Sequence, residues 1–380
     1  MIAVSRGLWK PLPSLLPATL SKNNPLAFST AKWNSPIKAT ISNPTLVSLE
    51  SCASMTRLKE IQAHMTRTGL ASHVFPASRL LAFCALSEQG NMNHARLLFS
   101  QFPLPNTYMW NTMIKGYYKV EMPVRGFLLF AKMVEMACEM DSRTYVYALK
   151  TCEKLRGNIN GVSVHCLIWK MGFESCVLVC NGLLHFYGEV GCLDVARKVF
   201  DEMLIKDVVS WTTVIHQHQQ LGYCDEALRL YNAMLKSEIE PNDTTLISVL
   251  SSCSKSGDED MGKKVHEQIR IGSENPSLKL MNAVVDMYVK CGSVAAAQQV
   301  FDEMPVRDVF TWTSMVNGYA KIGRVELARR LFDEMPEKNI VSWNAMIAGY
   351  SQNGLPNEAF ELFYDMIEQG LVPSENTLVC

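Results

Sequence analysis

The sequence predicts an all-α solenoid of helix-turn-helix repeats, 31–35 residues each, and three observations predict it. Phenylalanine recurs at steps of 101, 101 and 31 residues, at Phe99, Phe200, Phe301 and Phe332. Tryptophan keeps the same steps, at Trp110, Trp211, Trp312 and Trp343. A block of 101 residues divides into 35, 35 and 31, the length range of helical-hairpin repeats.

Each repeat is predicted to be a pair of helices, as the segment 309–339 illustrates. Its first half places apolar residues at helical spacing, at Trp312, Met315, Val316, Tyr319 and Ala320. Gly323 then permits a tight turn. A second apolar stripe follows at Val325, Ala328, Leu331, Phe332 and Met335. Pro336 ends this stripe because proline cannot continue a helix. So short a hairpin cannot bury both stripes, so we expect it to stack on its neighbours.

Placed end to end, the predicted repeats are 41–75, 76–106, 107–141, 142–176, 177–207, 208–242, 243–277, 278–308, 309–339 and 340–374. The first repeat is degenerate, and residues 375–380 resemble the start of a further, truncated one. Because each repeat packs only on its neighbours, we expect one continuous solenoid rather than separate domains.

The first forty residues differ in composition from the rest of the chain. Residues 1–49 contain no Asp or Glu and many Ser and Thr, and their bases are Arg6, Lys10, Lys22, Lys32 and Lys38. This composition is typical of an organelle transit peptide, so we expect residues 1–40 to be a disordered transit peptide for the mitochondrion or the plastid (chloroplast). The alternative is a disordered tail that carries no targeting signal.

The charge balance excludes binding through net charge alone. The chain has 36 Lys and Arg against 37 Asp and Glu, so it is not a polycation that would wrap phosphate or an anionic membrane. No run of 18 apolar residues occurs, so the sequence does not support a membrane span.

Cysteines, histidines and paired carboxylates often form metal or catalytic sites, but in this sequence they are predicted to pack between helices or to face solvent. The closest cysteines, Cys176 and Cys180, lack a second pair at zinc spacing. One histidine recurs every 101 residues, too far apart to share a metal, at His64, His165 and His266. Paired carboxylates such as Asp302 and Glu303 belong to a repeated phrase on the second helices, which favours solvent exposure. We predict no catalytic residue, metal, cofactor or small-molecule substrate.

Two solenoid families have a period in this range. Tetratricopeptide repeats are strictly 34 residues long, and their Trp, Leu-Gly and Pro pattern is not reproduced. The segments WNTMIKGY (110–117), WNAMIAGY (343–350) and ARKVFDEM (196–203), with repeat lengths of 35, 35 and 31, resemble the pentatricopeptide repeat family. They resemble in particular its PLS subfamily, found mainly in plant organelles. The resemblance spans about residues 41–380 and implies a right-handed superhelix that binds single-stranded RNA, one nucleotide per repeat.

The resemblance implies base-reading residues at two positions of each repeat, the fifth and the last. The pairs that resemble uracil readers are Asn111 with Asp141, Asn181 with Asp207, and Asn282 with Asp308. Those that resemble adenine readers are Thr212 with Asn242 and Thr313 with Asn339. Asn344 with Ser374 resembles a weaker, cytosine-leaning pair. Repeats 142–176 and 243–277 match no pair, with Val146 and Cys176, and Ile247 and Ser277. We expect the fifth residue to point into the concave groove.

The second residue of each repeat is implied to stack on the bases. These residues are Tyr108, Leu178, Val209, Phe310 and Val341, with Lys279 departing from the apolar preference. From residue 107 onward the implied RNA element is 5′-U-n-U-A-n-U-A-C. Stacking is worth about 1–3 kcal/mol per base, so base contacts rather than net charge are expected to dominate.

The most concrete functional hypothesis is a site-recognition factor for cytidine-to-uridine editing of organellar RNA. A separate DYW-type deaminase would then supply catalysis, since the sequence shows no His-x-Glu and Cys-x-x-Cys deaminase signature. Two alternatives stay open. One is an RNA processing or stabilisation factor, and the other is a tetratricopeptide-like scaffold whose groove takes a peptide.

Overall fold

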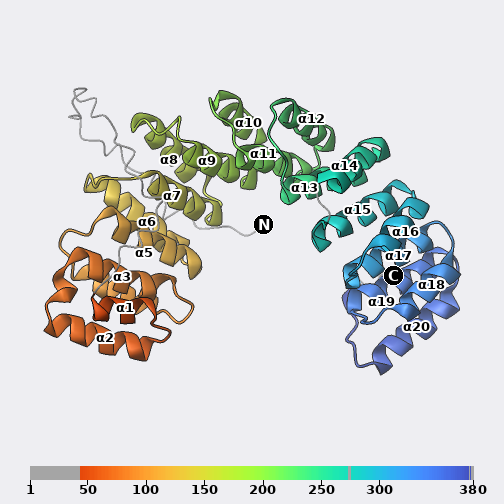
Figure 1. Ribbon diagram of the computed structural model, residues 1–380, viewed down its shortest axis with the longest axis horizontal. Coiled ribbons are helices and arrows are strands. Elements are labelled where there is room, and N and C mark those ends of the chain that lie inside the picture. The colour runs from red at the N-terminus through yellow and green to blue at the C-terminus, as the bar shows by residue number, and fades with distance from the viewer. Residues whose placement is uncertain (1–42, 273–274, 376, 378–380) are drawn as a thin grey trace, which may run out of the picture. The chain divides into compact units, whose positions relative to one another are not determined.

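The computed structural model describes residues 43–272, 275–375 and 377. The predicted transit peptide, residues 1–40, lies outside these residues. Every regular element in the described part of the chain is helical, which confirms the all-α prediction (Figure 1). The chain divides into two compact units, Met1–Leu204 and Ile205–Cys380.

The described helices of the first unit are α1 (Pro44–Glu50), α2 (Met55–Arg67), the short 3-10 helix η1 (Leu70–Ser72), α3 (Val74–Leu86), α4 (Met92–Ser100), α5 (Thr107–Lys119), α6 (Pro123–Glu135), α7 (Ser142–Lys154), α8 (Asn158–Lys170), α9 (Val177–Glu189) and α10 (Leu193–Glu202). Those of the second unit are α11 (Val208–Gln220), α12 (Cys224–Lys236), α13 (Asp243–Ser256), α14 (Glu259–Gly272), α15 (Leu278–Cys291), α16 (Val294–Glu303), α17 (Val309–Lys321), α18 (Val325–Glu334), α19 (Ile340–Gln352) and α20 (Pro356–Glu368).

The helices pack as consecutive antiparallel pairs, so that each pair forms one hairpin. From α3 onward the odd-numbered member is called the first helix of its hairpin and the even-numbered member the second helix. Each first helix contacts the next first helix of its unit. In one unit α3 contacts α5, α5 contacts α7 and α7 contacts α9, and in the other the contacts run in the same way from α11 through α13, α15 and α17 to α19. Each first helix also contacts its own second helix, so the first helices of a unit form one layer (Figure 1).

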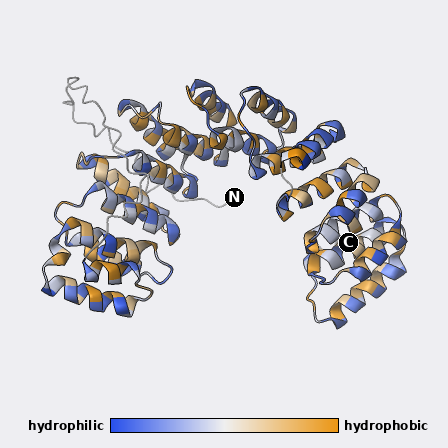
Figure 2. Cartoon of the chain, in the orientation of Figure 1, coloured by the Kyte–Doolittle hydropathy of each residue, from blue (hydrophilic) through white to orange (hydrophobic). Residues whose placement is uncertain are grey.

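Helix boundaries follow from local chemistry. Asp308 precedes α17 and its carboxylate accepts a hydrogen bond from the Thr311 amide at 3.0 Å, a reciprocal capping box. Between α17 and α18, Gly323 has a φ of 77°, a left-handed conformation that glycine adopts without steric cost. Hydrophilic residues cover the solvent side of second helices such as α14, where only Gly262, Val265 and Ile269 are buried (Figure 2).

The shared spacing of phenylalanine and tryptophan has a direct structural cause. Phe99, Phe301 and Phe332 each lie near the end of a second helix and pack edge-on against the tryptophan of the next first helix. The ring centroids are 4.8 Å apart for Phe99 and Trp110, 4.9 Å for Phe301 and Trp312, and 5.0 Å for Phe332 and Trp343. Edge-to-face aromatic pairs add about 0.5–1.5 kcal/mol to the burial of their surface. The two residues therefore recur together because they join successive hairpins.

The repeated histidines also join hairpins in two of three cases. His165 on α8 bonds the Tyr187 hydroxyl on α9 at 2.8 Å, and His266 on α14 bonds Tyr288 on α15 at 3.1 Å. His64 on α2 is exposed instead. In the described residues, no helix is long and apolar enough to cross a membrane, and no three His, Cys, Asp or Glu residues gather as a metal site would require.

Candidate nucleic-acid interface

The fifth and last residues of hairpin 107–141 meet at the junction with the next hairpin. Asn111 lies on α5, and Asp141 caps the N-terminus of α7. The Asn111 Nδ2 donates to Asp141 Oδ1 at 2.9 Å. The same Asp141 oxygen accepts from the amide and hydroxyl of Thr144, at 2.8 and 2.9 Å. One carboxylate oxygen therefore both caps a helix and orients the asparagine.

Hairpin 278–308 repeats this arrangement with one more contact. Asn282 Nδ2 donates to both carboxylate oxygens of Asp308, at 3.0 and 3.1 Å. The Thr311 hydroxyl donates to Asn282 Oδ1 at 2.6 Å. Burial opposes ionisation of Asp308, but hydrogen bonds from Thr311 and Asn282 outweigh it and lower the pKa of Asp308. The Asp308 side chain is therefore an ionised acceptor at neutral pH.

The cytosine-leaning pair is also brought together. Asn344 Nδ2 donates to Ser374 Oγ at 3.3 Å, and the Thr377 hydroxyl donates to Asn344 Oδ1 at 2.7 Å. Thr377 therefore donates a hydrogen bond to Asn344 in the same way as Thr311 donates one to Asn282.

The two threonine pairs differ from the asparagine pairs. Thr212 and Asn242 are linked only through Thr245, whose hydroxyl lies 2.7 Å from the Thr212 hydroxyl and 3.0 Å from Asn242 Oδ1. The Thr313 hydroxyl donates to the Val309 carbonyl at 2.7 Å, and the Asn339 side chain caps α19. Both threonine hydroxyls lie within hydrogen-bond distance of the carbonyl one turn earlier, Thr212 at 2.6 Å from Val208 and Thr313 at 2.7 Å from Val309.

Asn181 and Asp207 belong to different compact units. Asn181 lies half-buried on α9, and Asp207 caps α11, where its carboxylate accepts from the Ser210 amide at 2.8 Å.

Four of the six predicted fifth residues are buried in the structure. Asn111, Asn282 and Thr313 are 6% exposed and Thr212 is 9% exposed, because they lie where successive first helices approach. Their last-position neighbours are the exposed members of the pairs, at Asp141, Asn242, Asp308 and Asn339. A base edge would therefore meet the last residue first, and the fifth residue would set how that group is held.

In each unit the second residues leave apolar side chains in solvent. Their exposed fractions are 40% for Tyr108, 47% for Leu178, 49% for Val209, 55% for Phe310 and 56% for Val341. Lys279 occupies the same place on α15 and is exposed. Exposed apolar side chains that recur at one position of successive hairpins are available as stacking surfaces.

Further residues on the same helix face escaped the sequence prediction. The second, sixth, ninth and thirteenth residues of a first helix follow i, i+4, i+7 and i+11, so they share one face. The thirteenth residue is lysine in five hairpins, at Lys119, Lys154, Lys255, Lys290 and Lys321. The spacing of 11 residues between the second residue and this lysine could have revealed the lysine in the sequence. Lys154 is paired with Glu121 at 2.9 Å and Lys290 with Asp286 at 2.7 Å. The thirteenth-position lysines thus place positive charge on this face of the first helices, and these two acids balance part of it.

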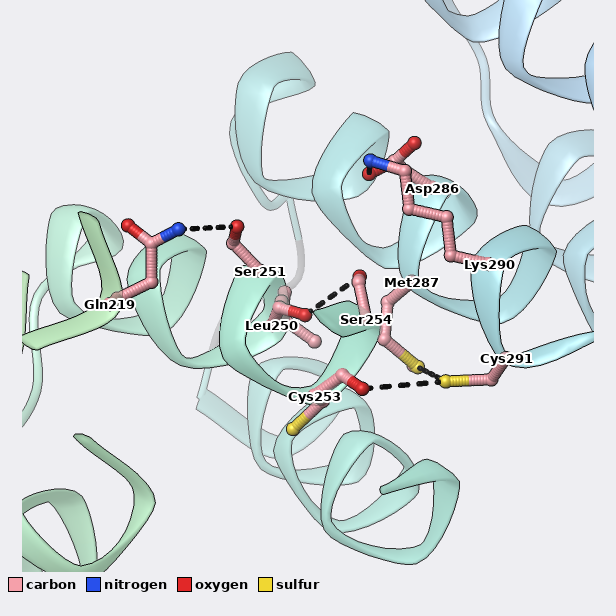
Figure 3. Close-up of polar contacts among 9 residues, drawn as sticks. All are labelled: Gln219, Leu250, Ser251, Cys253, Ser254, Asp286, Met287, Lys290 and Cys291. Carbon is pink, nitrogen blue, oxygen red and sulfur yellow. Dashed lines mark hydrogen bonds and ion pairs between the residues drawn. The ribbon is translucent and has the colours of Figure 1, made fainter. Parts of the chain in front are cut away.

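Hydrogen bonds between first helices also join successive hairpins of the second unit (Figure 3). Gln219 Nε2 on α11 donates to Ser251 Oγ on α13 at 2.8 Å. The Cys291 thiol on α15 donates to the Cys253 carbonyl at 3.7 Å, so this cysteine serves contact between hairpins (Figure 3). Burial raises the pKa of Cys253 to about 12, which keeps its thiol protonated and unreactive.

Comparison with known proteins identifies the family. A family model described as PPR repeat family matches residues 105–154, 206–255 and 338–379, and a second, described as PPR repeat, matches 178–208, 280–309 and 310–340. Together they cover more than half of the chain. The chain belongs to the pentatricopeptide repeat family.

Relatives in this family come from Arabidopsis thaliana. The chain is 36% identical to pentatricopeptide repeat-containing protein At2g22410, mitochondrial, over 75% of its own length and 42% of that protein. It is 36% identical to At1g59720, chloroplastic/mitochondrial, over 70% of its length and 43% of that protein. The chain thus spans under half the length of these two relatives.

A solved pentatricopeptide repeat structure has the same fold. The crystal structure of PPR10 in complex with an 18-nt psaJ RNA element aligns with a TM-score of 0.55 at 18% identity. The alignment covers 84% of this chain and 54% of PPR10.

Proposed function

We propose that this pentatricopeptide repeat protein binds single-stranded RNA sequence-specifically. The observation that carries the proposal is the repeated pairing of a polar fifth residue with an exposed last residue, beside an exposed apolar second residue. Asn282 with Asp308, flanked by Phe310, is the most complete example. An ionised carboxylate accepts from a base, an amide can donate or accept, and an aromatic ring stacks, which are the contacts that single-stranded RNA recognition uses.

The distribution of charge supports this proposal over binding through phosphate alone. The residues after 1–40 include 31 basic and 37 acidic side chains, so counterion release from a global positive charge is excluded. The thirteenth-position lysines place cations on the same face of the first helices as the exposed second residues. Sequence would be selected by base contacts, with the lysines adding affinity for phosphate.

We further propose that the protein recognises sites for cytidine-to-uridine editing in a plant organelle, with a DYW-type deaminase acting in trans. The 35, 35 and 31 residue periodicity of the PLS subfamily supports this role. The names of the relatives At2g22410, mitochondrial, and At1g59720, chloroplastic/mitochondrial, support an organellar location. The acid-free segment 1–49 supports the same location.

Two measurements test the two parts of the proposal, sequence-specific RNA binding and a role in cytidine-to-uridine editing. A labelled RNA with the element 5′-U-n-U-A-n-U-A-C should outcompete its scrambled version, and equal competition would contradict sequence-specific binding. Sequencing of organellar transcripts from a knockout plant should show loss of editing at sites downstream of a matching element. Altered transcript ends or levels with unchanged editing would instead favour an RNA processing or stabilisation factor.

A further inference from the structure

Helix α8, the second helix of hairpin 142–176, leaves a row of apolar side chains in solvent. Ile159 is 72% exposed, Val162 48% and Trp169 63%. Cys166, which lies between Val162 and Trp169 in the row, is exposed as well. The spacing of i, i+3, i+7 and i+10 places these four residues, called the α8 stripe below, on one face of the helix. The other side of α8 packs on the hairpin core, where Ile168 is fully buried.

The equivalent face of α14, 101 residues further along the chain, is charged instead. Its four positions hold Asp260, Lys263, Glu267 and Arg270, and all four are exposed. Arg270 forms an ion pair with Glu267 at 3.3 Å. A second helix at this place in the repeat therefore folds with charged residues in these positions. The hairpin fold does not require the α8 stripe, which indicates a contact with something outside the hairpin.

The charges on the neighbouring second helices are mostly basic. Helix α8 contains no Asp or Glu and ends at Lys170, which is exposed. The second helices of the two preceding hairpins, α4 and α6, carry Arg96, Arg125 and Lys132 against the single acid Glu135. By contrast, the second helices of the other unit, α12, α14, α16, α18 and α20, contain 7 basic and 14 acidic residues. The net charge of −1 for the whole chain therefore conceals a basic set of second helices around the α8 stripe.

The same neighbouring helices also expose apolar side chains. Leu97 on α4 is 57% exposed, and Val124 and Leu128 on α6 are 44% and 61% exposed. Helix α4 contacts α3 and α5, α6 contacts α5 and α7, and α8 contacts α7, so the three second helices follow one another along the layer of first helices (Figure 1). Apolar side chains that are about half or more exposed protrude from this surface and do not line a groove.

Protruding apolar side chains beside bases suit a lipid surface better than a protein partner. A partner helix needs a groove to receive its apolar face. A bilayer surface needs none: tryptophan is favoured at the level of the lipid headgroups, apolar side chains enter the acyl boundary, and bases attract anionic lipids. We propose that the α8 stripe, with Leu128 and the neighbouring bases, binds the surface of a membrane that contains anionic lipid. The proposed RNA contacts lie on first helices, so the two surfaces share no residue.

Exchange of the α8 stripe for the residues of α14 tests the proposal. The exchanged variant carries Ile159→Asp, Val162→Lys, Cys166→Glu and Trp169→Arg. It adds two acids and two bases, so the net charge of the chain is unchanged. Co-sedimentation of the full chain with phosphatidylcholine vesicles that contain about 30% phosphatidylglycerol measures the membrane affinity. The variant should bind about 10- to 100-fold more weakly than wild type, because it lacks the side chains that enter the bilayer.

Residues 1–40 carry five bases of their own and are present in both chains, so the difference in affinity reports on α8. The single change Trp169→Ser tests the same face with less disturbance and should lower the affinity about 3- to 10-fold. Unchanged thermal unfolding of either variant would establish that its loss of binding is local.

A second pair of variants tests the part played by charge. Arg125→Ala combined with Lys132→Ala removes two bases from α6 and should weaken binding to the anionic vesicles about 5- to 30-fold. Arg229→Ala combined with Lys236→Ala removes the same charge from α12 and is the matched control, which should keep the affinity of wild type.

The other outcomes would overturn the proposal. One is equal vesicle binding by wild type, the exchanged variant and Trp169→Ser. Another is equal binding of wild type to vesicles with and without phosphatidylglycerol. Wild type that ignores vesicles but self-associates with rising concentration, in a way that the exchange abolishes, would assign the stripe to a second copy of the chain instead.

Discussion

The Asn282 amide on α15 donates to both carboxylate oxygens of Asp308 at the start of α17, at 3.0 and 3.1 Å. Asp308 also caps α17 through the Thr311 amide. One contact thus joins two hairpins, caps a helix and fixes the group that a base would meet. If the proposed function holds, specificity and stability are coupled at this position, and mutations can separate them.

Exchanging the Asn282–Asp308 pair should change the base that the chain prefers. In the same unit Thr313 with Asn339 resembles an adenine reader, so Asn282→Thr combined with Asp308→Asn should shift the sixth element position from U toward A. Asparagine caps a helix as well as aspartate does, so the fold should be kept. Competition between RNAs that differ only at that position measures the shift. An unchanged preference for U would count against a reading role for the pair.

Removing the Asp308 cap should destabilise the second unit. Asp308→Ala deletes the acceptor of the Thr311 amide and leaves the Asn282 amide without its carboxylate, so we expect the free energy of unfolding to fall by about 1–2 kcal/mol. Asp308→Asn is the matched control and should lose less, because it can still accept from the amide. Urea denaturation of both variants measures the difference. Equal losses would mean that the cap contributes little.

The thirteenth-position lysines should govern the salt dependence of RNA binding. Lys321→Ala removes one cation from the first-helix face and should reduce the slope of log affinity against log salt by about 0.7, the value for one phosphate of a single strand. Lys236→Ala, in the last turn of the second helix α12, is the control and should leave the slope unchanged. The affinity is measured from about 50 to 200 mM salt. The same slope in both variants would place the phosphates elsewhere.

Acid should weaken the second unit through His266. Burial, the main cause, and the nearby Arg270 lower the pKa of His266 from 6.5, although Glu303 and Glu267 oppose this. The unfolded chain then takes up a proton more readily than the folded chain. The stability that His266 contributes is therefore complete above pH 6.5 and is lost as the pH falls below it.

His266→Gln should remove that part of the pH dependence. Urea denaturation between pH 5 and 7.5 measures it, with wild type losing more stability on acidification than the variant. In the first unit the hydrogen bond to Glu153 raises the pKa of His185 despite burial, which works in the opposite sense to His165. The effect should therefore be traced by a probe in the second unit.

The hairpin fold could be predicted because packing repeats in the sequence. The edge-to-face contact of Phe301 with Trp312 recurs at Phe332 and Trp343, so a constant spacing records a constant contact. The cap at Asp308 and the turn at Gly323 could be found from local residue preferences alone. Such features depend on neighbours in the chain or one hairpin away.

The burial of Asn111 and the position of the Lys115 ammonium over the Tyr147 ring could not be predicted. Both depend on how closely α5 and α7 approach, which spacing does not specify. Lys115 is near Tyr147 only because the two first helices lie side by side. The thirteenth-position lysines share a helix face with the second residues, but the family resemblance implies roles only for the second, fifth and last residues.

Selection from a random pool of single-stranded RNA tests the central claim most directly. Bound RNAs should be enriched in an element with U at the first, third and sixth positions and A at the fourth and seventh. The Asn282→Thr, Asp308→Asn variant should enrich A at the sixth position and leave the others unchanged. Enrichment of no element, or of one element that is identical for the wild type and the variant, would contradict the account.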